Sequence, residues 1–226
     1  TLTHRNSINK FRYDAALTLS LGRDEVIDWG DESNQLENMR RKGQSTGTTW
    51  MYESLGLFQT QEEIDNWKLN QDGTYKGKNK TIKPGDIKYK DQNDDGVLDD
   101  KDLKPFRDSQ YPDFTGSLRL GASYKGFFVS VMFQGVAGFK QYVSEMYSLE
   151  NSSLPKFQDY HLTDCWTPDN PNASFPRVKL ATARDNNRKK SSFWVRDNSF
   201  VRLKSVSVGY SLPSSVLSKL KLSSLS

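Results

Sequence analysis

The feature that most constrains the fold of this 226-residue chain is an alternation of apolar and polar residues in several short segments. In the segment 10–21, an apolar residue occupies every odd position from 11 onward, and mostly polar residues lie between them. Successive side chains of a β-strand point to opposite faces, so a period of two predicts a strand and not a helix. The same pattern predicts further strands at about 117–124, 127–136 and 199–210.

Two local signals refine these predicted strands. Only Lys125 and Gly126 separate the second strand from the third, which predicts a tight hairpin. In the fourth strand the apolar phase shifts between Leu203 and Val206, which predicts a β-bulge near residues 204–205. The chain is therefore expected to be all-β and antiparallel.

The other connections between the predicted strands are long, and they cover about residues 27–114 and 138–193. Connections of that length are uncommon unless they are functional. Long loops that alternate with short turns are typical of an outer-membrane β-barrel. A soluble antiparallel β-sandwich with two large insertions would show the same alternation, so the strand pattern leaves both architectures open.

Composition excludes several classes of protein. The net charge of +4, without a basic stripe, gives no reason to expect nucleic-acid binding. The only cysteine, Cys165, excludes an internal disulfide, and the two distant histidines, His4 and His161, argue against a zinc site. No apolar run reaches the roughly 18 residues of a membrane-spanning helix. Because the sequence has neither a nucleophile with a histidine partner nor a phosphate-binding glycine loop, we predict no catalytic residues, no organic cofactor and no enzyme activity.

A dense cluster of aspartates, DQNDDGVLDDKD, occupies residues 91–102. Its first half fits the calcium-loop template D-x-[DN]-x-[DN]-G, in which alternate side chains supply oxygen ligands and a glycine allows a sharp turn. Position twelve carries an aspartate instead of the glutamate of helix-loop-helix sensors. A metal-free acidic turn is the alternative. The predicted ligands of one structural Ca²⁺ are the side chains of five residues and the carbonyl of a sixth: Asp91, Asn93, Asp95, Val97 (carbonyl), Asp99 and Asp102.

A helix start is predicted in the first long connection. Thr60 is followed three residues later by Glu63, which fits a capping box, and the helix is expected to run toward Trp67.

Five segments together resemble the C-terminal barrel portion of the SusC/RagA family of TonB-dependent (TonB-linked) outer-membrane transporters. They follow the order of the family and cover nearly the whole chain. They are GLFQTQEEID (56–65), PGDIKYKDQNDDGVLDDKD (84–102), YKGFFVSVMFQGVAG (124–138), WTPDNPNASFPR (166–177) and SFVRLKSVSVGYSLP (199–213).

The resemblance implies a fold and a function that the residue pattern alone does not give. It implies a large antiparallel transmembrane β-barrel, 22-stranded in the family, with long extracellular loops and an N-terminal plug. It also implies import of oligosaccharides or peptides together with a SusD-like surface lipoprotein, driven by the TonB complex. The location would be the cell outer membrane of a Gram-negative, Bacteroidetes-type bacterium, and the barrel would contact membrane lipid.

The chain departs from the family pattern, because the plug, the TonB-contacting region and the last strands are missing from residues 1–226. Four strands cannot close a membrane barrel, since a lipid-exposed sheet tolerates no open edge. We therefore interpret the chain as a barrel fragment. The alternative function is that of a secreted, calcium-stabilised β-sandwich that binds glycans.

The barrel interpretation predicts an orientation and two faces. The turn at Lys125–Gly126 should face the periplasm, and the two long connections should lie outside the cell. Apolar side chains should meet lipid, namely Leu118, Leu120, Phe127, Val129, Val131 and Phe133. Polar side chains should face the lumen, namely Arg119, Ser123, Ser130 and Gln134.

Overall fold

The computed structural model describes the chain except for residues 31, 74–78, 108–110, 144–158, 180–185 and 214–226. The chain forms two units, and each is described by itself. Unit 1 contains residues 1–23, 110–140 and 197–226. Unit 2 contains residues 24–109 and 141–196, that is, both long connections.

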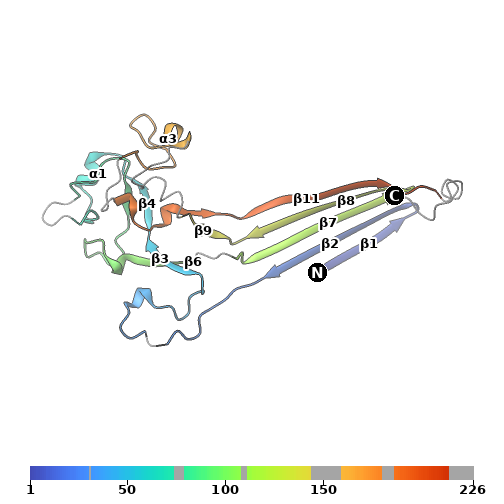
Figure 1. The fold of residues 1–226 in the computed structure, drawn as a ribbon, viewed down its shortest axis with the longest axis horizontal. Helices are drawn as coiled ribbons and strands as arrows, with labels where there is room; N and C mark the ends of the chain where they lie inside the picture. Colours follow the sequence, from blue (N-terminus) through green and yellow to red (C-terminus); the bar gives the residue numbers. More distant parts are fainter. Residues whose placement is uncertain (31, 74–78, 108–110, 144–158, 180–185, 214–226) are drawn as a thin grey trace. The chain divides into compact units, whose positions relative to one another are not determined.

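Unit 1 is built on one five-stranded antiparallel sheet, whose strands run side by side in the order β1-β2-β7-β8-β11 (Figure 1). The strands are β1 (Leu2–Ile8), β2 (Phe11–Leu21), β7 (Phe114–Tyr124), β8 (Phe127–Ala137) and β11 (Phe200–Tyr210). Strands β2, β7, β8 and β11 lie where the alternation predicted strands. Strand β1 was not predicted, because its interior from Thr3 to Ser7 is polar and shows no alternation.

The predicted hairpin and bulge are both confirmed. Tyr124 pairs with Phe127 across the turn, and Lys125 and Gly126 both have positive φ, at 48° and 93°. Positive φ at both central residues is the geometry of the two-residue turns that suit the twist of a hairpin. The register of β11 against β8 shifts between Leu203 and Ser205, at the predicted bulge.

The register of the sheet separates an apolar face from a polar face. Leu118 pairs with Phe133 and Leu120 with Val131, so these side chains share one face. All six residues predicted to meet lipid lie on this apolar face. The four residues predicted to face the lumen lie on the polar face. The register pairs Arg119 with Met132, Ser123 with Phe128, Ser130 with Gly121 and Gln134 with Ser117.

The apolar side chains of unit 1 are not buried. Val201 is 80% exposed, Val208 73%, Leu19 71% and Phe127 62%. Within the described part of unit 1, no apolar side chain reaches the burial of a core residue. The sheet is therefore a single layer, and the described residues of unit 1 do not close it into a barrel.

Unit 2 is built from short elements. Strand β3 (Thr48–Tyr52) pairs with β6 (Leu103–Arg107), and β4 (Ser54–Leu57) pairs with β5 (Ile87–Tyr89). A further pair, β9 (Lys140–Tyr142) and β10 (Val195–Asp197), lies where the sequence passes from one unit to the other. Among the described residues, the helices are α1 (Gln61–Asp65) and α3 (Asp159–Thr163), and the 3₁₀ turns are η1 (Glu37–Met39), η2 (Asp100–Asp102), η3 (Asn186–Arg188) and η4 (Ser192–Trp194).

The predicted helix start is confirmed. The Thr60 hydroxyl accepts a hydrogen bond from the Glu63 amide at 3.1 Å, and the Glu63 carboxylate accepts one from the Gln59 amide. The helix ends at Asp65, before the predicted limit near Trp67. None of the helices in the described parts of the chain is long and apolar enough to cross a membrane.

The two long connections share one hydrophobic core. Leu57, Leu69, Ile87 and Tyr89 come from the first connection, and they cluster with residues of the second, Cys165, Phe175 and Trp194. Tyr89, Ile87 and Trp194 are fully buried. The sequence indicated two separate long loops, and their folding into one body was not predicted.

Candidate functional site

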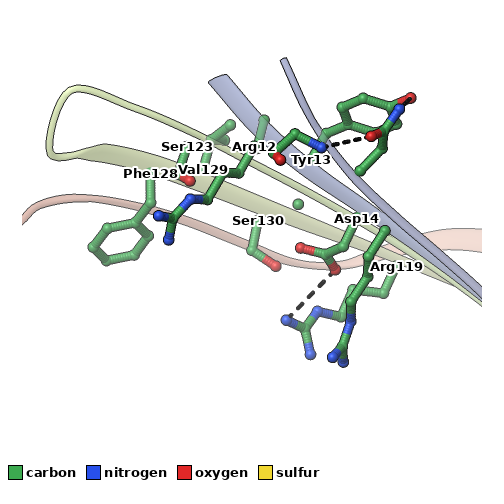
Figure 2. A pocket seen from close by; sticks show the side chains of 13 residues that line it. Arg12, Tyr13, Asp14, Arg119, Ser123, Phe128, Val129 and Ser130 are labelled. Atoms are coloured by element: carbon green, nitrogen blue, oxygen red, sulfur yellow. Dashed lines mark hydrogen bonds and ion pairs between the residues drawn. The ribbon is translucent and has the colours of Figure 1, made fainter. Parts of the chain in front are cut away.

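The polar face of the unit 1 sheet carries a concave surface lined by β1, β2, β7 and β8. Figure 2 shows Arg12 from β2 extending toward Phe128 and Ser130 of β8, with Asp14 and Arg119 beside them. The lining contains three arginines and one aspartate, which leaves a surplus of two positive charges. Its complete set of lining residues is Arg5, Asn6, Ser7, Arg12, Tyr13, Asp14, Arg119, Gly121, Ala122, Ser123, Phe128, Val129 and Ser130.

Glycine makes room for two of these side chains. A Cβ at Gly121 would lie 2.3 Å from a carboxylate oxygen of Asp14, so the carboxylate occupies the space that a larger residue would take. A Cβ at Gly209 would lie 2.3 Å from the Phe128 ring. The Asp14 carboxylate lies 3.8 Å from the Arg119 guanidinium, and the Arg119 side chain is 60% exposed. This pair is therefore an exposed, weak ion pair.

A buried carboxylate, Asp86, holds the two connections of unit 2 together. Its Oδ1 accepts hydrogen bonds from Arg177 Nε at 2.9 Å, Lys179 Nζ at 3.0 Å and Asn187 Nδ2 at 3.1 Å. Arg177 Nη2 lies 3.3 Å from the second oxygen, which also accepts from the Lys83 amide at 3.0 Å. Asp86 is fully buried, and a buried carboxylate is tolerated only where such partners compensate its charge.

Buried amides extend this network. Asn187 Oδ1 accepts a hydrogen bond from the Ile87 amide at 2.9 Å, while Asn186 and Gln71 both donate to the Ile87 carbonyl at 2.7 Å. The Tyr89 hydroxyl donates to the Asn186 carbonyl at 2.8 Å. Strand β5 therefore receives side-chain partners from η3, a segment about 100 residues later in the chain.

Three of the segments that carry the family resemblance meet at Gly85. The Gly85 amide donates to the Phe58 carbonyl at 2.7 Å, and its carbonyl accepts from the Arg177 amide at 3.0 Å. Gly85 has φ +87°, and a Cβ there would lie 2.5 Å from the Trp166 ring. Trp166 Nε1 donates to Gln59 Oε1 at 2.9 Å. The segments 56–65, 84–102 and 166–177 therefore build one structure in unit 2.

The six predicted calcium ligands lie together in a loop whose carboxylates mostly accept backbone amides. Asp91 Oδ2 accepts from Gly96 at 2.8 Å and Asp95 Oδ1 from Val97 at 3.0 Å. Asp102 is fully buried, and its two oxygens accept from Gln92 at 2.8 Å and Asp99 at 2.9 Å. The remaining acceptors are Asn93 Oδ1, toward Asp95 N, and Asp99 Oδ1, toward Lys101 N.

Other groups in this loop bear on its charge. The Lys101 ammonium lies 3.4 Å from Asp95 and 3.7 Å from Asp99. Burial raises the pKa of the Asp102 carboxyl, and the Asp91 and Asp99 carboxylates add to the rise although two backbone amides lower it. The amide of Val97 is the main cause that lowers the pKa of Asp95.

One oxygen in the loop has no partner. Asp91 Oδ1 is buried and accepts no hydrogen bond. Leu98 packs against the core of unit 2 and anchors the loop. In the described ranges, no group of three or more His, Cys, Asp or Glu side chains is assembled to hold a metal ion. The calcium site therefore stays a prediction. The unpartnered oxygen of Asp91 supports it, whereas the carboxylates that accept backbone amides do not need a cation to be satisfied.

The aspartate loop also affects a neighbouring tyrosine. Burial raises the pKa of Tyr52 to about 12, and the nearby carboxylates of Asp100, Asp102 and Asp99 contribute to the rise.

Sequence reasoning missed the residues around Asp86. The distance in sequence between Asp86 and Arg177 is 91 residues, and no local pattern marks a pair so far apart. The signal that could have found them is the resemblance, because Asp86 and Arg177 both lie in segments quoted for it.

Comparisons with known proteins place this geometry in context. No protein-family model matches the chain. The TonB-dependent receptor P26 of Formosa agariphila is 28% identical over 217 residues, which is 91% of this chain and 20% of that protein. The TonB-dependent receptor P3 of the same organism is 28% identical over 183 residues, 79% of this chain and 16% of that protein. The chain thus spans about a fifth of the length of these curated relatives.

Solved structures give the same result for the fold. The RagAB peptide transporter matches with a TM-score of 0.62 at 19% identity, covering 96% of this chain and 22% of the matched chain. The RagAB peptide importer in its closed-closed state matches with a TM-score of 0.59 at 20% identity, covering 95% and 22%. The resemblance seen in the sequence is therefore confirmed: the chain is similar to a part of TonB-dependent receptors, and its fold matches a part of the RagAB peptide transporter.

Proposed function

We propose that the receptor to which this chain contributes imports nutrients across the outer membrane with energy supplied through TonB. The similarity to TonB-dependent receptors supports the energy source, and the RagAB-like fold supports import. In this proposal the sheet of unit 1 is barrel wall, unit 2 is extracellular, and the chain has a transport role and not an enzymatic one.

The observation that carries this proposal is the uncovered apolar face of the sheet. Four neighbouring strands place an aromatic ring in one row beside the Lys125–Gly126 turn: Phe11, Tyr124, Phe127 and Tyr210. The rings of Phe127 and Tyr210 lie 4.5 Å apart. Membrane strands carry an outward apolar band flanked by aromatic residues.

The same observation weighs against the alternative of a secreted β-sandwich. A sandwich covers the apolar face of one sheet with a second sheet about 10 Å away. The described residues of unit 1 supply no second sheet, and the face remains open.

We propose two partners and a cargo class on the same basis. A SusD-like surface lipoprotein would dock on the extracellular side, and the TonB complex would act through parts of the receptor outside this chain. The cargo would be an oligosaccharide or a peptide, and peptide import is the property named for the RagAB neighbours.

Uptake measurements test the function. Cells with and without the gene are grown on defined oligosaccharides and peptides, and uptake of each labelled compound is measured with and without a proton uncoupler. We expect one cargo class to depend on both the gene and the proton gradient. Equal uptake in the deleted strain for every compound would contradict the proposal. Extraction of the receptor without detergent would restore the sandwich alternative.

Cysteine labelling of whole cells tests the orientation. The native Cys165 is buried, and it is replaced by serine as the background. A thiol introduced at Lys125 avoids the strain that a Cβ at Gly126 would cause against Tyr210, 2.8 Å away. We expect an impermeant reagent to label a thiol at Asn170 but not one at Lys125. The reverse pattern would invert the topology.

We further propose that the aspartate loop binds one structural Ca²⁺ through Asp91, Asn93, Asp95, the Val97 carbonyl, Asp99 and Asp102. Calcium prefers such oxygen ligands, and extracellular sites bind it with Kd values of about 10⁻⁴ to 10⁻³ M. The buried, unpartnered Asp91 Oδ1 and the cost of charging Asp102 are two penalties that a cation would relieve. The ion would keep the loop folded against the core of unit 2.

Calcium titration with matched variants tests this site. Asp95→Ala removes a proposed ligand, whereas Asp94→Asn changes an adjacent exposed aspartate outside the proposed set. We expect calcium to protect the backbone near Gly96 from proteolysis in the wild type and in Asp94→Asn, but not in Asp95→Ala. Proteolysis near Gly96 that chelator leaves unchanged in every variant would exclude the site.

A further inference from the structure

The apolar face of the unit 1 sheet is interrupted by a groove of about 380 Å³. Its floor is formed by Gly116 of β7 and Gly135 of β8, which are direct cross-strand partners and are named here the glycine pair. The other residues of the apolar face that line the groove come from four neighbouring strands: Leu17, Leu19, Phe114, Leu118, Phe133 and Val201. The groove is therefore bounded by hydrocarbon side chains and by backbone.

Glycines on the polar face of the sheet are explained by a neighbour within the chain, whereas the glycine pair is not. A Cβ at Gly121 would lie 2.3 Å from the Asp14 carboxylate, and one at Gly209 would lie 2.3 Å from the Phe128 ring. A glycine inside a strand costs stability, and it commonly marks a bulge, a bend or the close approach of another group. The register of β7 against β8 is regular through the glycine pair, so no bulge accounts for it.

Two aliphatic side chains form the sides of the groove. Leu19 is the cross-strand partner of Gly116, Val201 is that of Gly135, and their methyl groups would lie 3.0 and 3.2 Å from a Cβ on these glycines. Leu19 is 71% exposed and Val201 80%, so the described part of unit 1 leaves them uncovered. Neighbouring strands are about 4.8 Å apart, which leaves room for one extended hydrocarbon chain between these two side chains.

The place of the glycine pair in the sheet makes its exposure independent of the rest of the receptor. Strands β7 and β8 lie inside the sheet, with β2 on one side and β11 on the other. In the proposed barrel, further strands extend the wall sideways and a plug lies on the opposite, polar face, so neither covers the groove. In the proposed orientation the glycine pair occupies the second row of apolar-face residues from the extracellular end of β7 and β8, at the level of the outer leaflet.

We propose that this groove binds one acyl chain of a membrane lipid of the outer leaflet. The inference rests on the proposed role of the sheet as barrel wall. A methylene chain can contact the backbone floor and both sides of the groove at once, and many such dispersion contacts add up. A second copy of the receptor would need a complementary surface of at least about 1,200 Å² in total, and a flat wall would not reach a floor that lies between two protruding side chains.

Photolabelling of the purified full receptor in nanodiscs tests the proposal. The discs contain one phosphatidylcholine with a diazirine midway along an acyl chain, so both leaflets present the same probe. Val201 and Val208 are matched reporters, because both lie on the apolar face of β11 and are 80% and 73% exposed. They occupy the second row from opposite ends of the sheet, but the row of Val208 contains Ala122 and Val129 where that of Val201 contains the glycine pair.

Trypsin separates the two reporters because it cleaves after Arg202. We expect the peptide that contains Val201 to carry at least about threefold more label than the peptide that contains Val208. This comparison is made in the wild type and does not depend on any variant.

Two valine substitutions then locate the site. Gly116→Val should remove the excess label at Val201, because the new side chain fills the groove and the nearest group that must move is the flexible end of Leu19. Ala122→Val adds bulk to the control row and should leave the excess unchanged. Heat-modified gel mobility checks that both variants are folded.

Several outcomes would overturn the proposal. Equal labelling of the two reporters would mean contact with bulk lipid only. Receptor dimers with no label at Val201 would assign the groove to a second copy. An excess that disappears when the receptor is prepared together with a surface lipoprotein would assign the groove to the anchor of that lipoprotein. Labelling of neither reporter would instead contradict the proposed barrel wall itself, so the two failures are distinguishable.

Discussion

Unit 1 and unit 2 differ most in where their large apolar side chains lie. In unit 2, Tyr89, Ile87 and Trp194 are fully buried and form a core with residues of both connections. In unit 1, the apolar side chains share one face of a single sheet and remain exposed. The same driving force, removal of apolar surface from water, is satisfied in unit 2 by the protein itself. In unit 1 the apolar side chains leave water only if something outside this sheet covers them, and for a membrane wall that cover is lipid.

The largest expected effect concerns the buried carboxylate of unit 2. Asp86→Ala should lower the free energy of unfolding of unit 2 by about 3–5 kcal/mol, because it leaves Arg177 and Lys179 without their buried partner. Hydrogen exchange of the full receptor should show faster exchange in β5 and η3 and unchanged exchange in β7 and β8.

An exposed pair in the same unit gives the control. The Lys90 side chain is 45% exposed and lies 3.6 Å from Glu53. Lys90→Ala should cost less than about 1 kcal/mol. If Asp86→Ala also loosened the sheet, the two units would not be independently stabilised and the comparison would fail.

The next effect concerns the apolar face of unit 1. Val131→Arg near the middle of β8 should destabilise the receptor by about 2–4 kcal/mol in a bilayer, because the charge would lie in hydrocarbon. Gln134→Arg, on the opposite face, should cost much less. Heat-modified gel mobility of both variants measures the difference. Small and equal effects would show that the apolar face does not meet lipid.

A smaller effect concerns the start of α1. Thr60→Ala should cost about 1 kcal/mol, because the Glu63 amide loses its acceptor. Gln61→Ala removes only the contact to Asp65 at 2.9 Å and should cost a few tenths of a kcal/mol. Local hydrogen exchange in residues 61–66 distinguishes the two. Equal exchange would mean that packing of Ile64, and not the cap, holds this helix.

The smallest effect is a pH dependence of the aspartate loop. The pKa of Asp102 is raised in the folded state, so its protonated form is favoured by folding. Its contribution to stability is therefore fully present below the ordinary pKa of 3.8 and is lost as pH rises through the folded value.

Proteolysis near Gly96 in chelator, measured as pH falls from 7 toward 4, reports this dependence. Protection should increase in the wild type, and Asp102→Asn should remove the pH-dependent part while shifting the baseline. Added calcium should flatten the wild-type profile. A profile that is the same in the wild type and in Asp102→Asn would assign the titration to other groups.

The sequence predicted the membrane-type strands well because their signal is local. Alternation in β2, β7 and β8, the Lys125–Gly126 turn and the phase shift in β11 each depend on residues close in the chain. Strand β1 lacks that alternation, and its pairing with β2 is what makes this segment a strand. The order of strands in the sheet could not be predicted from local sequence either, because β2 pairs with β7 about 90 residues later.

The folded state of the long connections could not be predicted for a related reason. The core of unit 2 joins Ile87 and Tyr89 to Trp194, and the Asp86 network joins segments 91 residues apart. Each segment alone looks like a polar loop with scattered aromatic residues. The loop of aspartates was located from its spacing, but the spacing cannot tell whether its oxygens turn toward a cation or toward backbone amides.

The contact between Arg107 and Asp24 bears on how the chain folds. These residues stand near the two ends of the first connection, and their side chains lie 3.3 Å apart beside the β3–β6 pair. Closing a flexible loop between Leu21 and Phe114 would cost roughly 4 kcal/mol of chain entropy.

We expect the pairing of β3 with β6 to form first, because it shortens the loop that must close when β2 meets β7. The distant strands β2 and β7 would then pair as if a shorter linker joined them, and so faster than their separation in sequence suggests.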